Sequence, residues 1–137
     1  MQKQNILSRL PEQSNQEVFQ DILRTPNIRI ERIVSYGQSS PEQGWYDQDE
    51  GEWVMLLQGS AVLVFADGSE VSLSAGDYLN IPAHCKHRVA MTDAEQATVW
   101  LAVFYREWGW IRKCLSEKFF QAGIELYFMV YLFVFYF

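Results

Sequence analysis

The residues best suited to chemistry in this chain are one glutamate and the two histidines of the sequence. Glu52 heads an alternating apolar run, and His84 and His87 follow a proline further along the chain. A carboxylate among apolar neighbours is unfavourable unless it is paired or coordinated. Imidazole and carboxylate groups ligate transition metals and also form general acid–base pairs. These three residues are therefore candidates for a metal site or for a site of proton transfer.

His84 and His87 are three residues apart, and on a regular strand such residues point to opposite faces. Both can enter one pocket only if residues 82–85 form a turn, which Pro82 favours because it has no N–H for a strand ladder. We expect His87 to face the pocket. For His84, a pocket position and a surface position both remain open. Cys85, between them, is either a soft metal ligand or an inert thiol, and we expect the inert thiol.

Short strands and tight turns must position these groups. Asp67-Gly68 separates two apolar runs, as is typical of a β-hairpin with a type I′ turn, in which both central residues have positive φ. Phe104 shares a predicted strand face with Trp100 and Ala102, which would make the pocket aromatic and dry there. The strands predicted from alternation and apolar runs are residues 28–36, 52–58, 60–66, 69–73, 78–81 and 97–105.

The spacing of this stretch resembles the two sequence motifs of the cupin family. Glu52 and Gly59 fit the second half of the first motif, and Gly76, Pro82 and His87 fit the second motif. The resemblance covers about residues 28–105 and is closest to small single-domain bacterial cupins of no assigned reaction. It implies an all-β fold, a double-stranded β-helix of the jelly-roll type resembling RmlC, with one pocket and a homodimeric assembly.

The chain departs from the family where metal ligands are expected. The two histidines of the first motif would fall at Tyr46 and Gln48, or at Trp45 and Asp47. A site of three histidines and one glutamate therefore cannot be built. A facial set of two histidines and one carboxylate would need both histidines to face inward. The candidate ligands for a divalent transition metal (Fe, Mn, Ni or Zn) are Glu52, His87, His84 and Gln48.

Two classes of function follow from this departure. In the first, the barrel pocket binds a small molecule and the metal site is degenerate or weak. In the second, the protein is a divalent-metal-dependent enzyme on small molecules, of oxygenase or isomerase type. No nucleophile–base pair has diagnostic spacing, so catalytic residues and a reaction are not assigned. The predicted ligand pocket is formed by Tyr46, Gln48, Glu52, Val54, Leu56, His87 and Phe104.

Glu52 also has a purely structural interpretation, an ion pair with a cation such as Arg88. The neighbouring carboxylates of Asp47, Asp49 and Glu50 are most simply explained as a solvated acidic loop. They lack the spacing of a calcium-binding loop. Glu52 differs from them because Val54 and Leu56 share its strand face.

Composition narrows the possible partners. The chain has 137 residues and a formal net charge of −6, without a basic cluster for phosphate contacts. A nucleic-acid partner is therefore not expected. Two cysteines predict no disulfide framework, and no apolar leader segment is visible, so we expect a cytoplasmic protein.

The two ends of the chain are predicted separately from the barrel of residues 28–105. In residues 1–27, Ser14 and Glu17 have the form of a capping box, and apolar residues at helical spacing predict a short helix over 15–24. Residues 106–137 form an atypical aromatic tail with three open interpretations. It is a membrane-associating segment, an amphipathic or aggregating segment, or not native coding sequence. We favour the last, so a membrane is not expected as a partner.

Overall fold

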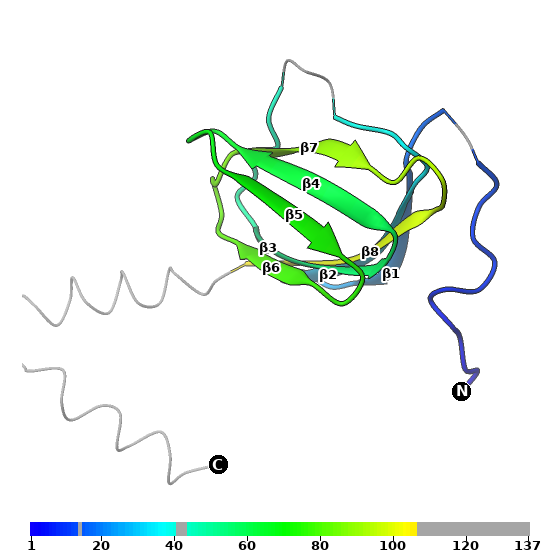
Figure 1. Cartoon of the computed structure of the whole chain (residues 1–137). Helices are drawn as coiled ribbons and strands as arrows, with labels where there is room; N and C mark the ends of the chain where they lie inside the picture. The colour runs from blue at the N-terminus through cyan, green and yellow to red at the C-terminus, as the bar shows by residue number, and fades with distance from the viewer. Residues whose placement is uncertain (14, 41–43, 107–137) are drawn as a thin grey trace, which may run out of the picture. The chain divides into compact units, whose positions relative to one another are not determined.

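The computed structural model describes residues 1–13, 15–40 and 44–106. Within these ranges the chain folds into two antiparallel β-sheets that face each other (Figure 1). One sheet has the strand order β1-β2-β8-β3-β6, and the other has the order β5-β4-β7. The strands are β1 (Val18–Arg24), β2 (Ile28–Ser35), β3 (Gly51–Gln58), β4 (Ser60–Phe65), β5 (Glu70–Ser74), β6 (Tyr78–Ile81), β7 (His87–Thr92) and β8 (Thr98–Tyr105).

The predicted hairpin between β4 and β5 forms, but its turn is of another type. Gly68 has φ 86°, whereas Asp67 is not among the described residues with positive φ, so the type I′ prediction is wrong. The Gly68 N–H donates to the Phe65 carbonyl at 3.0 Å, and the Phe65 N–H donates to the Ser69 carbonyl at 2.9 Å. This pattern is a type I turn followed by a left-handed glycine, the alternative hairpin connection that needs only one positive φ.

The turn between β3 and β4 depends on Gly59, the glycine of the first motif. Gly59 has φ 82°, and a Cβ at this position would lie 2.7 Å from Thr98 Oγ1 and 2.9 Å from Thr98 Cα. Both the backbone conformation and the close approach of β8 therefore require glycine. This tight connection holds β3 against the central strand β8.

The helix predicted over residues 15–24 is wrong, because residues 18–24 form β1. This edge strand pairs antiparallel with β2, from Val18 opposite Val34 to Arg24 opposite Arg29. The register shifts between Asp21 and Leu23, and most β1 side chains are exposed. A short isolated helix is marginally stable in water. The free edge of β2 offers backbone hydrogen bonds along the whole segment, and these outweigh the weak helical pattern.

The main core lies between the two sheets. Alternate residues of β3 and β8 point inward, which places Val54, Leu56, Trp100, Ala102 and Phe104 in one cluster. Ala61, Leu63 and Leu73 from the facing strands β4 and β5, and Ile81 from β6 beside β3, complete it. Because β8 lies between β2 and β3, its inward side chains occupy the middle of the barrel.

The strands from β2 to β8 lie within residues 28–105, the predicted barrel. The boundary between the lead-in and the barrel at residue 27 stays a prediction. Strand β1, which lies before this boundary, joins the same sheet as β2. The predicted aromatic tail of residues 106–137 lies, beyond Arg106, outside the described residues. Within the described ranges, no helix has the length and hydropathy needed to cross a membrane.

Candidate functional site

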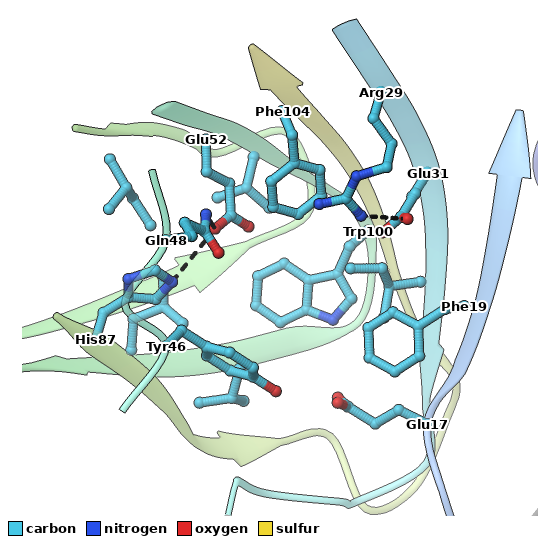
Figure 2. Close-up of a pocket in the computed structure, with 15 residues that line it drawn as sticks. Glu17, Phe19, Arg29, Glu31, Tyr46, Gln48, Glu52, His87, Trp100 and Phe104 are labelled. Carbon is cyan, nitrogen blue, oxygen red and sulfur yellow. Dashed lines mark hydrogen bonds and ion pairs between the residues drawn. The ribbon is translucent and has the colours of Figure 1, made fainter. Parts of the chain in front are cut away.

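A cavity of about 260 Å³ lies between the two sheets (Figure 2). Its walls combine aliphatic and aromatic side chains with a few charged and polar groups. It is lined by Glu17, Phe19, Arg29, Glu31, Ile33, Tyr46, Gln48, Glu52, Val54, Leu63, Ile81, His87, Val89, Trp100 and Phe104. Phe19 belongs to β1, Glu17 directly precedes this strand, and three lining residues belong to β2, so the edge strands contribute as well as the central ones.

Glu52 is held deep in the sheet by β3. Glu52 is only 9% exposed, and its backbone pairs with Phe104 of β8 on one side and with Ile81 of β6 on the other. The Gln48 side-chain amide donates from Nε2 to Glu52 Oε2 at 3.0 Å. This bond offsets part of the desolvation of the buried carboxylate.

His87 begins β7 on the facing sheet and reaches Glu52 across the cavity. His87 Nε2 lies 3.3 Å from Glu52 Oε2, and the two side chains are 5% and 11% exposed. His87 Nδ1 lies 2.8 Å from the carbonyl oxygen of Cys85. A carbonyl can only accept, so Nδ1 carries a proton and Nε2 is the nitrogen presented to the cavity. The backbone of Cys85, rather than its thiol, thus orients the imidazole.

Two opposing effects act on the pKa of His87. Burial is the largest single effect and lowers the pKa, because it disfavours the charged ring. The hydrogen bonds that the His87 ring donates to Glu52 and to the Cys85 carbonyl, with the charge of Glu52, together outweigh burial, so the pKa of His87 is raised above 6.5. The site therefore favours an imidazolium–carboxylate pair inside the barrel.

Tyr46 covers one side of this pair. Its backbone forms an isolated antiparallel bridge with His87, with the Tyr46 N–H donating at 2.8 Å and the His87 N–H donating at 3.3 Å. The ring centroids of Tyr46 and His87 are 5.6 Å apart. Tyr46 is 41% exposed, so it lies where the cavity meets solvent. The loop before β3 thereby brings Tyr46 and Gln48 to the same site as Glu52.

Arg29 and Glu31 form a second charged group on β2, and the sequence analysis did not identify it. Arg29 forms ion pairs with Glu31 and with Glu50, the latter at 3.4 Å. Its guanidinium carbon lies 3.8 Å from the centroid of the Phe104 ring. The side of β2 that lines the cavity carries Arg29, Glu31 and Ile33, and the charges of Arg29 and Glu31 neutralise each other.

The predicted site residues divide into two groups in the structure. The cavity is lined by Tyr46, Gln48, Glu52, Val54, His87 and Phe104. Leu56 lies outside the lining, because it is fully buried in the core beneath the cavity. Glu52 is paired with His87, whereas the guanidinium of Arg88 lies over the Trp45 ring at 5.6 Å from its centroid.

His84 also lies outside the cavity. Residues 82–85 do form a turn, in which the Cys85 N–H donates to the Pro82 carbonyl at 3.1 Å. His84 has φ 61° in this turn, and its side chain is 68% exposed. Its ring nitrogens lie 3.3 Å from Asp47 Oδ1 and 3.5 Å from Asp49 Oδ1. The turn therefore directs His84 outward to the acidic loop.

These positions do not fit the usual metal site of three histidines and one glutamate. Of the candidate ligands, only Glu52 and His87 bring typical metal-binding atoms together inside the cavity, and the Gln48 amide donates to Glu52. In the part of the chain that the structure describes, no group of three or more His, Cys, Asp and Glu side chains could hold a metal ion. Two protein ligands are fewer than the three that catalytic zinc sites generally use.

Several lining residues come from segments that the sequence analysis placed elsewhere. Glu17 and Phe19 were assigned to the helix, and only the pairing of β1 with β2 brings them to the cavity. Glu17 Oε1 accepts a hydrogen bond from Ser35 Oγ at 2.6 Å. Trp100 was expected on the same face as Phe104, and both line the cavity.

Comparisons with known proteins agree with this architecture. A family model described as a cupin domain matches residues 32–104. A crystal structure from Ralstonia eutropha JMP134, provisionally named a mannose-6-phosphate isomerase, is 42% identical with a TM-score of 0.74. That similarity covers 78% of this chain and 100% of the Ralstonia chain. No curated protein matches the sequence.

More distant structures share the fold alone. A cupin superfamily protein from Desulfitobacterium hafniense DCB-2 is 20% identical, with a TM-score of 0.61 over 72% of this chain and 84% of its own. An RmlC-like cupin with a double-stranded β-helix fold from Methanocaldococcus jannaschii is 15% identical. Its TM-score is 0.56 over 71% of this chain and 86% of its own.

Proposed function

Because the chain belongs to the cupin family, we propose that its barrel cavity binds a small organic molecule, with the Glu52–His87 pair as the polar anchor. The observation that carries this proposal is the 3.3 Å contact between His87 Nε2 and Glu52 Oε2 inside an otherwise largely apolar cavity. Ligand pockets combine apolar walls with a few convergent polar groups in this way.

The size of the cavity supports a small ligand. Its volume of about 260 Å³ lies just below the range of about 300–1,000 Å³ that is common for ligand sites. Aromatic walls from Tyr46, Trp100 and Phe104 offer large contact areas. Tyr46 is partly exposed and marks a route by which a ligand reaches Glu52 and His87.

The anchor can also exchange a proton with a bound molecule. His87 Nε2 and Glu52 Oε2 together offer one proton and one acceptor, and Gln48 adds an amide donor next to the carboxylate. A hydroxyl or carbonyl group placed between them would form hydrogen bonds with both. The same arrangement would serve general acid–base catalysis if the ligand has an acidic C–H or O–H within reach.

The second candidate is a divalent-metal-dependent enzyme on small molecules. One observation favours it: the bond from Nδ1 to the Cys85 carbonyl presents Nε2 of His87 beside Glu52 Oε2. In metal sites, the ring nitrogen of a histidine that does not bind the metal commonly donates to a carbonyl or carboxylate in this way, which orients the ring. The Ralstonia protein's provisional name makes a sugar-phosphate isomerase one version of this candidate. The shortage of ligands makes us place it second.

Nitrogen NMR of the two histidines separates these candidates in the full chain. The protein is first treated with a chelator and then titrated with D-mannose, D-mannose 6-phosphate, 4-hydroxybenzyl alcohol and 4-hydroxybenzoate. The proposal expects at least one compound to shift the His87 ring signals while those of the exposed His84 stay in place. Glu52→Gln should weaken that binding, because it removes the charged acceptor.

The same titration is repeated after addition of Fe(II), Mn(II), Ni(II) or Zn(II). Binding that occurs only with a metal present would favour the second candidate. A failure to shift His87 under either condition would reject both. A homodimer and a cytoplasmic location stay predictions from the sequence and its family resemblance.

A further inference from the structure

The indole N–H of Trp100 is a buried donor for which the described residues supply no partner. Trp100 is 3% exposed, and its Nε1 has no hydrogen-bond partner among the described residues. Buried polar groups nearly always form hydrogen bonds, and burying such a group without a hydrogen bond is unfavourable. Trp100 is also one of the residues that line the cavity, so a molecule in the cavity is the nearest candidate for the missing acceptor.

The position of the indole defines a second polar end of the cavity. Figure 2 shows the nitrogen on the edge of the ring that faces the space between Tyr46 and Glu17. The Glu52–His87 pair lies at the other end, beyond the six-membered part of the Trp100 ring. Glu17 is fixed there by the hydrogen bond from Ser35 Oγ at 2.6 Å. A donor and a carboxylate acceptor thus lie at the end away from the anchor.

The charges of the lining oppose an anionic ligand. Three carboxylates line the cavity, from Glu17, Glu31 and Glu52, against two basic groups from Arg29 and His87. Both basic groups have carboxylate partners, Arg29 with Glu31 and Glu50, and His87 with Glu52. A phosphate or carboxylate ligand would have to break one of these pairs while approaching further carboxylates.

Building on the proposed function, we propose that the cavity selects an uncharged ligand that bridges its two polar ends. One oxygen of the ligand accepts the Trp100 N–H, and a neighbouring hydroxyl donates to Glu17. A second hydroxyl or carbonyl group meets the Glu52–His87 pair. Small polyols, sugars without phosphate and hydroxylated aromatic alcohols have this chemistry.

The test uses matched uncharged and anionic probes on the full chain. D-mannose is compared with D-mannose 6-phosphate, and 4-hydroxybenzyl alcohol with 4-hydroxybenzoate. The readouts are the indole N–H signals, with Trp100 assigned from Trp100→Phe, and the ring signals of His87. We expect the uncharged member of at least one pair to bind more tightly and to shift both Trp100 and His87.

Two substitutions sharpen the test. Trp100→Phe keeps an aromatic ring but removes the donor together with part of the indole volume, and it should weaken binding of the uncharged probe about three- to tenfold. Trp53→Phe is the matched control, because Trp53 packs against Tyr78 outside the cavity lining. Glu17→Gln should reduce the preference for the uncharged probe, whereas Glu70→Gln, on the exposed part of β5, should not.

The outcomes separate this inference from the proposed function. Tighter binding of the anionic members would overturn the charge selection. A probe that shifts His87 but leaves Trp100 unchanged would overturn the second polar end, with water satisfying the indole, and would leave the proposed function intact. The absence of any shift at either end would overturn the proposed function itself. If Trp100→Phe does not fold, the Trp100 indole signal is assigned by multidimensional NMR of the wild-type protein, and its shift and Glu17→Gln still decide.

Discussion

The two histidines of this protein stand three residues apart and lie in opposite environments. His87 is buried at the start of β7, with its Nε2 3.3 Å from Glu52 Oε2. His84 is exposed in the preceding turn, at 3.3 Å and 3.5 Å from the carboxylates of Asp47 and Asp49. Both thus face carboxylates at similar distances, and burial rather than partner type distinguishes them.

This difference shows how one turn assigns two identical side chains to different roles. The left-handed conformation of His84 reverses the chain just before β7 and directs its ring to solvent. His87 then enters the sheet with its side chain inward. In water an ion pair is screened and contributes little, whereas inside the barrel an unpaired charge is costly. The following predictions test that contrast.

The largest expected effect comes from removing each imidazole in turn. His87→Ala leaves the Glu52 carboxylate without its charged partner and enlarges the cavity. It should lower the free energy of unfolding by about 3 kcal/mol. His84→Ala removes only exposed pairs and should change it by less than about 1 kcal/mol. Urea denaturation at pH 6 measures both.

A double variant checks that the first effect comes from the pair itself. Glu52→Gln combined with His87→Ala should lose less stability than the two single variants added together, because no charge remains unpaired. Equal losses for His87→Ala and His84→Ala would remove the distinction between the buried and the exposed site.

The next effect concerns metal binding. The buried site has two candidate ligands, one fewer than catalytic zinc sites generally use. Gln48→His would place an imidazole where the amide now contacts Glu52 Oε2 at 3.0 Å. With Glu52 and His87 it would supply three ligands, the number found in catalytic zinc sites. We expect the dissociation constant for Ni(II) or Zn(II) to fall at least tenfold, since even outer-shell partners change metal affinity by about 10–100-fold.

Isothermal titration with Ni(II) and Zn(II) measures this change. The matched control is Gln96→His, which adds an imidazole in an exposed loop away from the cavity. An equal gain in both variants would mean that the cavity geometry contributes nothing. A tight site already present in the unsubstituted chain would instead revive the metalloenzyme candidate.

The sequence predicted the parts of this site that depend on local patterns. Gly59, the Asp67-Gly68 hairpin and the turn after Pro82 are signalled by residue types within a few positions. Glu52 and His87 followed from their places in the two motifs. The pairing between them depends on two facing sheets, and no spacing within one strand encodes it.

The features that the sequence did not predict depend on contacts between segments that are distant in the sequence or on an unusual backbone conformation. Glu17 and Phe19 reach the cavity only because β1 adds to the edge of β2, a pairing that competes successfully with a helical pattern. On β2, Arg29 and Glu31 line the cavity as a mutually neutralised pair, which the types of the two residues alone do not reveal. The direction of His84 depended on a backbone conformation that its residue type rarely adopts.

A third prediction concerns the pKa of His87 and its dependence on Glu52. Burial alone lowers this pKa, and the interactions with Glu52 contribute to raising it. Glu52→Gln should therefore move the His87 titration midpoint downward, as measured by NMR of the ring protons. Asp47→Asn, next to the exposed His84, is the control and should leave the His87 midpoint unchanged.

Stability should follow the same shift. With a raised pKa, His87 contributes stability that is fully present below 6.5, its unfolded value, and is lost as pH rises through its folded value. In Glu52→Gln, if burial dominates, this contribution reverses and stability is lost as pH falls through the lowered folded value. Urea denaturation from pH 5 to 9 measures both trends, and parallel pH profiles for the two proteins would contradict the role of Glu52.

The smallest expected effect is at His84, which has a left-handed backbone conformation. Its φ of 61° is unfavourable for a side chain with a Cβ but not for glycine. His84→Gly should relieve this strain while losing only exposed contacts to Asp47 and Asp49. After the added entropy of the unfolded chain, we expect a net gain of about 0.5 kcal/mol in the free energy of unfolding. The neighbouring Ala83, which is not among the described residues with positive φ, provides the control, and Ala83→Gly should lower stability. A loss of stability in both variants would show that the contacts of His84 with the acidic loop outweigh its backbone strain.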